Sequence, residues 1–285
     1  MNLEELKTFL EVIDSGSLVA ASKRLHVTPS TVTARMTALE EHIGQKLLHR
    51  NKSGTELTSA GFKLRRYAEL MTQLWRQARY EVSLPKGIEG VCNVGLEFDL
   101  WRDVGERLLD HLRTQCPSIA IALWPGEQPQ LHRWLNTGLV DVAFRYAAEA
   151  AEGFASRELF NDELVMVSKA ASTSGALDST YVYVDHGEEF RREHAAAFPA
   201  DWTCLVTIAS SDWALDHLRR SGGKGYLPRR YVDPLVRSGE LFRVADAPTF
   251  SRRVYAVENV ATVRQWHWYE QAMTAISAER AREPA

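Results

Sequence analysis

Residues 28–44, TPSTVTARMTALEEHIG, restrict the fold of this chain more than any other stretch. The Thr-Pro pair that opens them is typical of a helix start, because a threonine side chain caps the first turn and proline leaves no N–H unpaired there. The apolar residues then step by four, three and four positions: Val32, Met36, Leu39 and Ile43. That spacing places them in one stripe along a helix, and neighbouring elements must cover the stripe.

Two shorter helical patterns precede this helix. In the first, apolar residues recur at helical spacing until the glycine of DSGS ends the pattern: Leu3, Leu6, Leu10 and Ile13. Ser17 is a suitable N-cap for the second. Three short helices separated by tight turns predict a helix-turn-helix arrangement.

The face opposite the stripe carries small side chains. At about 100° per residue, Ser30, Ala34 and Thr37 point away from the stripe. A solvated face normally carries Glu and Lys, whereas small hydroxyl-bearing residues can approach a DNA groove closely and hydrogen-bond to phosphates and base edges. A merely polar face is the alternative. The DNA contacts that we expect from this helix are Thr28, Ser30, Thr31, Thr33 and, from nearer the edge of the stripe, Arg35.

Residues 47–58, LLHRNKSGTELT, predict two short strands around a turn-rich tip. Arg50 and Lys52 lie beside that tip, where a wing would touch the DNA backbone or the minor groove. An ordinary surface hairpin with solvated charges is the alternative.

A long helix is expected after the hairpin, from a cap at Thr58 to about Leu84. Leu64, Met71 and Ala78 repeat every seven residues along it. This near-heptad stripe predicts pairing of helices between two chains, and packing on the chain's own body is the competing explanation.

The stretch LPKGIEG, residues 84–90, predicts a domain boundary, because one proline and two glycines separate periodic segments there. Residues 1–87 hold 13 Lys+Arg and 9 Asp+Glu, net +4, whereas the remainder holds 21 and 28, net −7. Beyond the boundary, strand-like stretches alternate with helical ones, which indicates an α/β architecture. The predicted strands are 90–98, 119–124, 140–146, 163–168, 181–184 and 204–210, and the predicted helices are 101–117, 128–138, 212–223 and 261–280. The difference in net charge between the two parts fits a basic contact domain joined to an acidic body.

Motifs of other protein classes are missing from the sequence. It has no HExxH, CxxC, GxSxG or GxxxxGK[ST] pattern, and its histidines lack metal-ligand spacing. We therefore expect no enzyme activity, no metal and no cofactor. No run approaches the ~18 apolar residues of a membrane span, and the first residues lack a secretory signal pattern, so we expect a cytoplasmic protein. Three widely spaced cysteines are expected to be free thiols: Cys92, Cys116 and Cys204.

Five stretches resemble the LysR-type transcriptional regulators of bacteria: residues 1–13, residues 16–50, ELTSAGFKL at 56–64, LVDVAFRY at 139–146 and LRRSGGKGYLP at 218–228. The resemblance implies an α+β multidomain chain with a winged helix-turn-helix at 1–58, a linker helix and hinge at 59–87, and a two-lobed, periplasmic-binding-protein-like α/β effector domain at 88–285. It also implies a homodimer or homotetramer that binds double-stranded promoter DNA and a small-molecule effector.

The recognition helix departs from the pattern of that family. Relatives commonly have Gln at the position of Pro29, Arg at that of Ala34, a basic residue at that of Thr37 and Gln at that of Arg35. Fewer cations on this helix predict fewer phosphate contacts and a weaker dependence of DNA binding on salt.

The same resemblance predicts an effector cleft between the lobes. Its expected lining is Phe98, Asp99, Trp101, Gln128, Arg145, Tyr146, Thr207, Ser210 and Ser211. Relatives often have Ser or Thr near the position of Asp99, at a helix N-terminus that binds a carboxylate. A carboxylate in the chain itself would compete with an anionic ligand there, so we expect a cationic, aromatic or neutral effector, with Phe98 and Trp101 offering apolar or cation–π contacts. A capping role for Asp99 and core packing for Trp101 are the alternatives.

Two other functions stay open at this point. The chain could be an architectural DNA-binding protein that needs no ligand, its α/β body serving only dimerisation. It could also be a redox-responsive regulator that acts through its cysteines.

Overall fold

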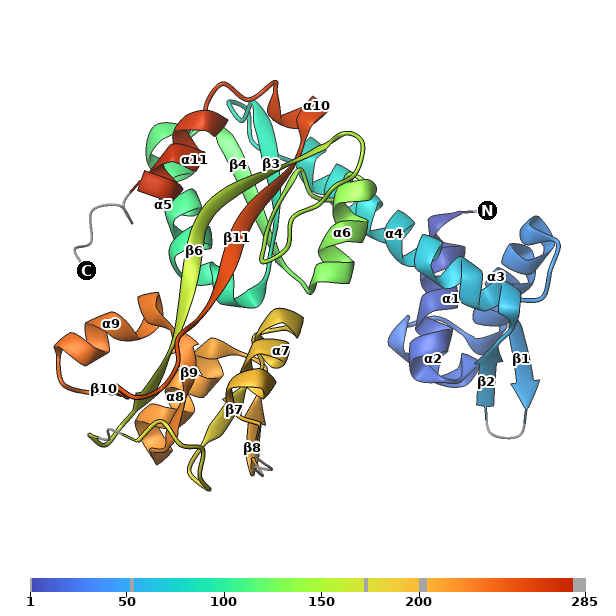
Figure 1. The fold of residues 1–285 in the computed structure, drawn as a ribbon. Coiled ribbons are helices and arrows are strands. Elements are labelled where there is room, and N and C mark those ends of the chain that lie inside the picture. The colour runs from blue at the N-terminus through green and yellow to red at the C-terminus, as the bar shows by residue number, and fades with distance from the viewer. Residues whose placement is uncertain (1, 52–53, 172–173, 200–203, 279–285) are drawn as a thin grey trace. The chain divides into compact units, whose positions relative to one another are not determined.

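The computed structural model describes residues 2–51, 54–171, 174–199 and 204–278. The chain divides into two units, Met1–Lys86 and Gly87–Ala285, drawn in blue to cyan and in green to red in Figure 1. Each unit has a hydrophobic core of its own. Within the described ranges, the helices are all too short or too polar to cross a membrane.

The first unit contains three short helices, a hairpin and a long helix. These are α1 (Leu3–Ser15), α2 (Leu18–Arg24), α3 (Pro29–Ile43), β1 (Leu48–Asn51), β2 (Gly54–Leu57) and α4 (Ser59–Val82). Ser17, Thr28 and Thr58 cap α2, α3 and α4 by accepting a backbone N–H, as the sequence predicts.

The apolar stripes of α1 and α3 pack together in the core of this unit. Its fully buried members include Leu6, Phe9, Val12, Val32, Met36 and Leu39. Ile43 was predicted to belong to the stripe, and that prediction is wrong, since its side chain is 39% exposed. It is the last residue of α3, and Gly44 ends the helix in the left-handed conformation, so the stripe stops one turn earlier.

Backbone contacts fix the hairpin and the start of α4 within this unit. The N–H of Thr55 donates to the carbonyl of Gly16 at 3.0 Å, and the N–H of Thr58 donates to that of Leu47 at 3.0 Å. A Cβ atom on Gly61 would lie only 2.1 Å from the Leu47 carbonyl oxygen. Glycine at this position therefore allows α4 to begin against the hairpin.

The second unit has two lobes. The first lobe contains β3 (Gly90–Leu96), η1 (Phe98–Leu100), η2 (Trp101–Gly105), α5 (Glu106–Gln115), β4 (Ile119–Pro125), α6 (Gln128–Asn136), β5 (Val142–Arg145), α10 (Val260–Val263) and α11 (Tyr269–Ala278). The second lobe contains β7 (Val182–Val184), α7 (Glu188–Ala197), β8 (Val206–Ile208), α8 (Ser211–Ser221), β9 (Lys224–Pro228), α9 (Arg229–Arg237) and β10 (Phe242–Arg243).

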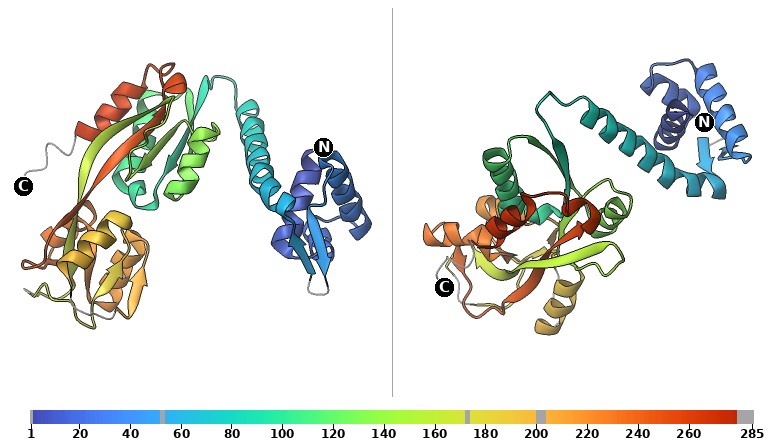
Figure 2. Two further views of the ribbon diagram at one scale, coloured as in Figure 1. Left: turned by 45° about the vertical axis from the view of Figure 1, so that its right-hand side comes forward. Right: turned by 90° about the horizontal axis from the view of Figure 1, so that it is seen from above.

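Two long strands, β6 (Phe154–Ser168) and β11 (Phe250–Asn259), run from one lobe to the other, as Figures 1 and 2 show. Among the described residues the main sheet has the order β10-β6-β11-β5-β3-β4, with β9 also paired to β6, and β7 and β8 form a separate pair. β3 is parallel to β4 and β5, whereas β11 is antiparallel to β5 and β6. The antiparallel pair of β6 and β11 is thus the element that the two lobes share.

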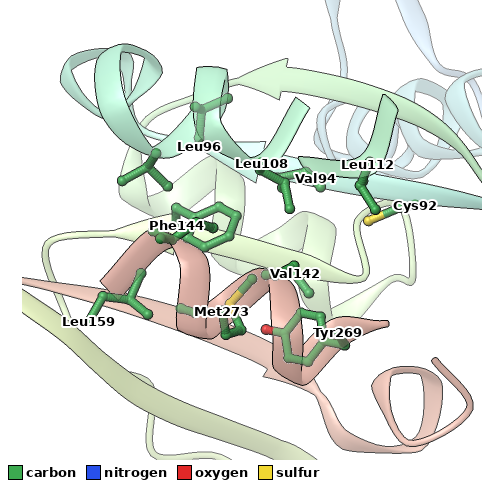
Figure 3. Packing of buried hydrophobic residues seen from close by; sticks show 14 of the residues in the cluster. Cys92, Val94, Leu96, Leu108, Leu112, Val142, Phe144, Leu159, Tyr269 and Met273 are labelled. Carbon is green, nitrogen blue, oxygen red and sulfur yellow. The ribbon is translucent and has the colours of Figure 1, made fainter. Parts of the chain in front are cut away.

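Each lobe has a separate core. In the first, Leu108 and Leu112 of α5 and Tyr269 and Met273 of α11 lie in one buried cluster with Val142 and Phe144 of β5 (Figure 3). In the second, side chains of β6, β7, β9 and α8 meet, including Val165, Val184, Leu218 and Leu227. Because each lobe packs around its own core, the space between the lobes can remain open as a cleft.

The structure differs from the sequence prediction in this unit at several elements. The strand predicted at residues 163–168 is only the end of β6, whose first part pairs with β11. The helix predicted over residues 261–280 is interrupted between α10 and α11, where Trp266 and Trp268 stack at 4.9 Å between ring centroids. α7, α9, β9, β10 and β11 have no counterpart among the predicted elements. The strands among these segments form through pairing with residues far away in the sequence, and such pairing leaves only a weak local pattern.

Candidate functional sites

A cluster of hydroxyl groups marks the start of α3. Thr28 Oγ1 accepts the N–H of Thr31 at 3.2 Å and lies 2.8 Å from both Ser30 Oγ and Thr31 Oγ1. Pro29 begins the helix beside them. The backbone N–H groups and the hydroxyls of this turn provide hydrogen-bond donors at the positive end of the helix.

The exposed face of α3 has the composition that periodicity predicts. Ser30, Ala34 and Thr37 are exposed, and Thr31 and Thr33 are half-buried beside them. No side chain on this face from Ser30 to Thr37 is long and charged except that of Arg35. Its shape therefore suits close approach to another surface.

The guanidinium of Arg35 lies against α1 in the structure. Its Nη1 donates to Thr8 Oγ1 at 3.3 Å and lies 3.7 Å from Glu4 Oε2. The side chain is 27% exposed. In this conformation Arg35 links α3 to α1 and does not extend beyond the exposed face.

The hairpin after α3 is a wing by its topology. β1 and β2 are antiparallel, and Arg50 is paired in register with Thr55. The backbone of Arg50 thus belongs to β1, near the tip. Lys52, the other cation expected at the wing, lies outside the described residues.

In the second unit, residues of both lobes and of β11 line a cleft of about 560 Å³. Four of the predicted effector residues belong to its lining: Phe98, Asp99, Gln128 and Tyr146. Phe98 also borders a neighbouring cavity of about 460 Å³, together with Trp101, Ser210 and Trp213. Ser211 does not line either cavity but hydrogen-bonds to Asp99.

Two further predicted residues, Arg145 and Thr207, are also not part of either lining. Arg145 is buried, and its Nη1 donates to Glu149 Oε2 at 3.1 Å. Thr207 is exposed on β8.

Asp99 joins the lobes through its carboxylate. Oδ1 accepts the N–H of Ser211 at 3.0 Å, and Oδ2 accepts Ser211 Oγ at 2.5 Å and Arg252 Nη2 at 3.1 Å. Burial disfavours the charged form, but the interactions with His186, Arg252 and Ser211 outweigh it and hold the pKa of Asp99 well below its ordinary value. The carboxylate is therefore ionised in the folded protein.

His186 is completely buried beside this carboxylate. Its Nε2 lies 2.9 Å from the Tyr226 carbonyl oxygen and must donate to it, while Nδ1 lies 3.8 Å from Asp99 Oδ2. That separation is too long for a hydrogen bond, and Nδ1 has no other partner among the described residues. Burial lowers the pKa of His186, and the neighbouring Asp99 carboxylate acts in the opposite direction.

A second buried carboxylate, Asp162 of β6, binds two arginines behind the cleft. Arg230 Nε donates to Asp162 Oδ1 at 2.8 Å, and Arg252 Nη2 lies 3.4 Å from Oδ2. The Asp162 side chain is 1% exposed and each guanidinium-bearing side chain 6%. Arg252 also lies over the ring of Tyr146, 3.7 Å from its centroid. The two guanidinium groups and the Asp162 carboxylate therefore pair with one another away from solvent.

The sequence prediction missed Asp162, His186, Arg230 and Arg252, which come from four distant segments. A signal did exist for Arg252. Buried and exposed residues alternate at the start of β11, and Arg252 lies on the buried face of the strand between Phe250 and Val254. A charged residue in the buried phase of a strand needs a partner, and that requirement indicates a site.

The cleft lining is acidic. It contains six carboxylates and two arginines: Glu97, Asp99, Glu127, Asp185, Glu188 and Glu189, with Arg191 and Arg252. Both arginines already bind carboxylates of this lining, since Arg191 contacts Asp185 and Glu188 and Arg252 contacts Asp99. The potential in the cleft therefore favours cations.

The geometry of the described residues does not favour metal binding or thiol chemistry. In the described part of the chain, no three His, Cys, Asp or Glu side chains are grouped so that they could hold a metal ion. Burial raises the pKa of Cys92 and of Cys116, which disfavours the reactive thiolate.

A winged helix-turn-helix followed by a two-lobed α/β unit with a cleft defines a class of ligand-responsive DNA-binding proteins. Two family models match this chain: the bacterial regulatory helix-turn-helix protein of the lysR family over residues 3–62, and the LysR substrate binding domain over residues 86–261. The chain belongs to the LysR family of bacterial transcriptional regulators. It is a DNA-binding regulator with an effector-binding domain and not an enzyme, and this membership does not favour the architectural or the redox alternative.

Named relatives agree with this assignment. The HTH-type transcriptional regulator HdfR of Salmonella schwarzengrund is 28% identical over 260 residues, which cover 90% of this chain and 92% of HdfR. Among solved structures, the LysR family regulator CbnR matches with a TM-score of 0.70 and 19% identity over all of both chains. Full-length LysG of Corynebacterium glutamicum with bound effector Arg matches with a TM-score of 0.56 and 21% identity, covering 98% of this chain and 99% of LysG.

Proposed function

We propose that this regulator reads promoter DNA through the hydroxyl face of α3 and responds to a cationic effector in the acidic cleft. The excess of carboxylates over arginines in the cleft lining is the observation that carries the choice of effector. Because proteins of this family act on DNA, we propose that it works in the cytoplasm. The working boundaries are 1–58 for DNA binding, 59–87 for the linker helix and hinge, and 88–285 for the effector domain.

The proposed DNA contacts from α3 are Thr28, Ser30, Thr31, Thr33 and Arg35, with Arg50 and Lys52 of the wing on the DNA backbone. The exposed hydroxyls of the first turn support this set, since recognition helices contact base edges with their N-terminal residues. Arg35 reaches the DNA by rotating its side chain away from Thr8 and Glu4.

The proposed effector carries a positive charge and an apolar part. Glu127 and Glu189 are exposed carboxylates of the cleft lining and would attract the cation. Phe98 borders both the cleft and the neighbouring cavity with Trp101 and Trp213, which suits an apolar or aromatic group. Arginine, the effector bound to LysG, is a cation of the class proposed for this chain.

A pair of probes with one ring system and opposite charges tests the effector proposal. We expect tryptamine to raise the Tm of the full-length protein with saturation, and indole-3-acetate to leave it unchanged, because a ligand of the native state stabilises it in proportion to ln(1 + [L]/Kd). Agmatine against citrulline provides a second pair, charged against neutral. The variant with Glu127→Gln and Glu189→Gln should weaken binding of the cations. Stabilisation by indole-3-acetate alone would contradict the proposal.

We further propose a homodimer formed through α4, or a homotetramer built from two such dimers. Tyr67, Met71, Leu74 and Trp75 are 37–51% exposed on this helix although they are apolar. Covering them against a second copy would remove that surface from water. Sedimentation of Leu74→Glu should show monomers where the unsubstituted protein dimerises, with Gln73→Glu as a charge-matched control on the same helix.

A further inference from the structure

The carboxylate of Asp99 lies in the first lobe but is bound by groups outside it. Asp99 belongs to η1, directly after β3. Its side-chain partners are Ser211, the first residue of α8 in the second lobe, and Arg252 of the shared strand β11. A capping role for Asp99 in its own helix was one alternative from the sequence. Instead, its carboxylate accepts hydrogen bonds from Ser211 of the second lobe.

The receiving groups form a built anion site. The 11-residue helix α8 presents the N–H and Oγ of Ser211, which is fully buried, at its positive end. Arg252 is 6% exposed and adds a charged donor at 3.1 Å. His186 Nδ1, buried and without a partner among the described residues, borders the same space 3.8 Å from the carboxylate. A small free carboxylate would need the same donors.

The backbone of Asp99 is held by the second lobe as well. Its carbonyl oxygen accepts Arg230 Nη2 at 2.6 Å and Tyr231 Oη at 2.8 Å, both from α9. Arg230 Nη1 also donates to the carbonyl of Arg102 at 3.1 Å. The second lobe thus hydrogen-bonds to both the backbone carbonyl and the side chain of Asp99, and these contacts fix the position of the carboxylate in the anion site.

We propose that Asp99 is a tethered ligand: its carboxylate occupies an anion site of the second lobe and holds the two lobes together without any free anion. Free carboxylates are excluded from that site, and the effector is left with the remaining, acidic part of the cleft. The proposal concerns the joining of the lobes and does not depend on the charge of the effector.

Chemical rescue tests the proposal in the full-length chain. Asp99→Ala should lower the Tm, and sodium acetate or formate should then restore part of it in a saturable way, by a few degrees relative to sodium chloride at equal ionic strength. The unsubstituted protein should not respond, because its own carboxylate fills the site. Asp99→Asn keeps the volume filled without the charge and should respond no more than the unsubstituted protein. Equal responses of Asp99→Ala and the unsubstituted protein would overturn the proposal.

A milder variant covers the case in which Asp99→Ala does not fold. Ser211→Ala removes one donor of the anion site and keeps its N–H. We expect hydrogen exchange to rise together in residues 98–105 of the first lobe and 210–214 of the second, since Asp99 joins them. A rise confined to residues 210–214 would mean that Asp99 does not hold the lobes together. Because these experiments use acetate, formate or no ligand, they can fail while the cationic effector proposal stands, and the reverse is also true.

Discussion

The two functional surfaces of this protein treat charge in opposite ways. The exposed face of α3 presents hydroxyl and methyl groups, and the guanidinium of Arg35 lies against α1. The cleft of the effector unit is lined and backed by ions, with Asp162, Arg230 and Arg252 almost fully buried. The first surface suits the close approach that we propose for DNA binding, and the second suits the proposed selection of an effector by its charge.

The difference teaches how each surface tolerates change. In the proposed DNA interface each exposed hydroxyl of α3 contributes one hydrogen bond, so single substitutions should have modest effects. Buried ions depend on one another, because removal of one partner leaves an uncompensated charge in a region without water. Substitutions behind the cleft should therefore destabilise the fold much more than substitutions on α3 weaken DNA binding.

The largest expected effect is on Asp162. Replacing Asp162 by Ala leaves Arg230 and Arg252 without their shared carboxylate, and we expect a loss of about 3–5 kcal/mol in the free energy of unfolding. Urea unfolding measures it. The neighbouring residue provides a matched control, since Glu163 pairs with Arg229 at the surface, and Glu163→Ala should cost only about 0–1 kcal/mol. Similar losses of stability in Asp162→Ala and Glu163→Ala would contradict the expectation that the buried ion cluster matters more than a surface ion pair.

The effector unit should also be sensitive to acid. Burial lowers the pKa of His194 to about 4, and its Nε2 lies 2.8 Å from Tyr181 Oη. Since the unfolded chain binds a proton near the ordinary value of about 6.5, this histidine should reduce stability by about 2 kcal/mol between pH 7 and pH 5. Burial lowers the pKa of His186 in the same direction. His194→Phe should show a shallower decline in Tm over that range, and an unchanged decline would refute the assignment.

Arg35 tests whether α3 reads DNA with a charge after all. If it leaves Thr8 and reads a base, Arg35→Ala should weaken specific binding by about 1–3 kcal/mol and relax the preference at one position. We expect this result, measured by titrating DNA sites that differ at single base pairs. A loss of stability with unaltered base preference would mean that Arg35 only joins α3 to α1.

The smallest effects should come from single hydroxyls. Thr33→Val keeps the shape of the side chain and removes the hydroxyl, which should weaken specific binding by about 0.5–1.5 kcal/mol. The salt dependence should stay the same because no cation is lost. Thr37→Val, one turn farther from the start of α3, should have less effect. Equal losses from both variants would indicate a face that is polar without reading DNA.

Local chemistry made the first unit predictable from the sequence. Ser17, Thr28 and Thr58 cap helices through contacts within three residues, and such contacts are visible in the sequence. The prediction failed at Ile43, where the end of α3 left the stripe uncovered. The α/β alternation of the second unit could be predicted as well, because strands and helices have different periods.

The cleft was predictable only in part. The residues that follow β3 and β5 could be placed at it through family resemblance, but the partners of Asp99 and Asp162 could not. Asp162 and Arg252 meet because β6 and β11 pair over their length, and Arg230 lies on a helix that the sequence pattern did not indicate. Long-range pairing of this kind has no local signature, except for the buried phase of Arg252.

Genome-wide capture of DNA bound by the purified full-length protein, at two salt concentrations, tests most directly whether α3 reads sequence. We predict a short list of sites that share an interrupted inverted repeat and persist at the higher salt concentration, because hydroxyl contacts to base edges release few counterions. Diffuse binding that disappears at the higher salt concentration would contradict that prediction. It would mean that the hydroxyl face of α3 recognises the DNA backbone and shape and not the base sequence.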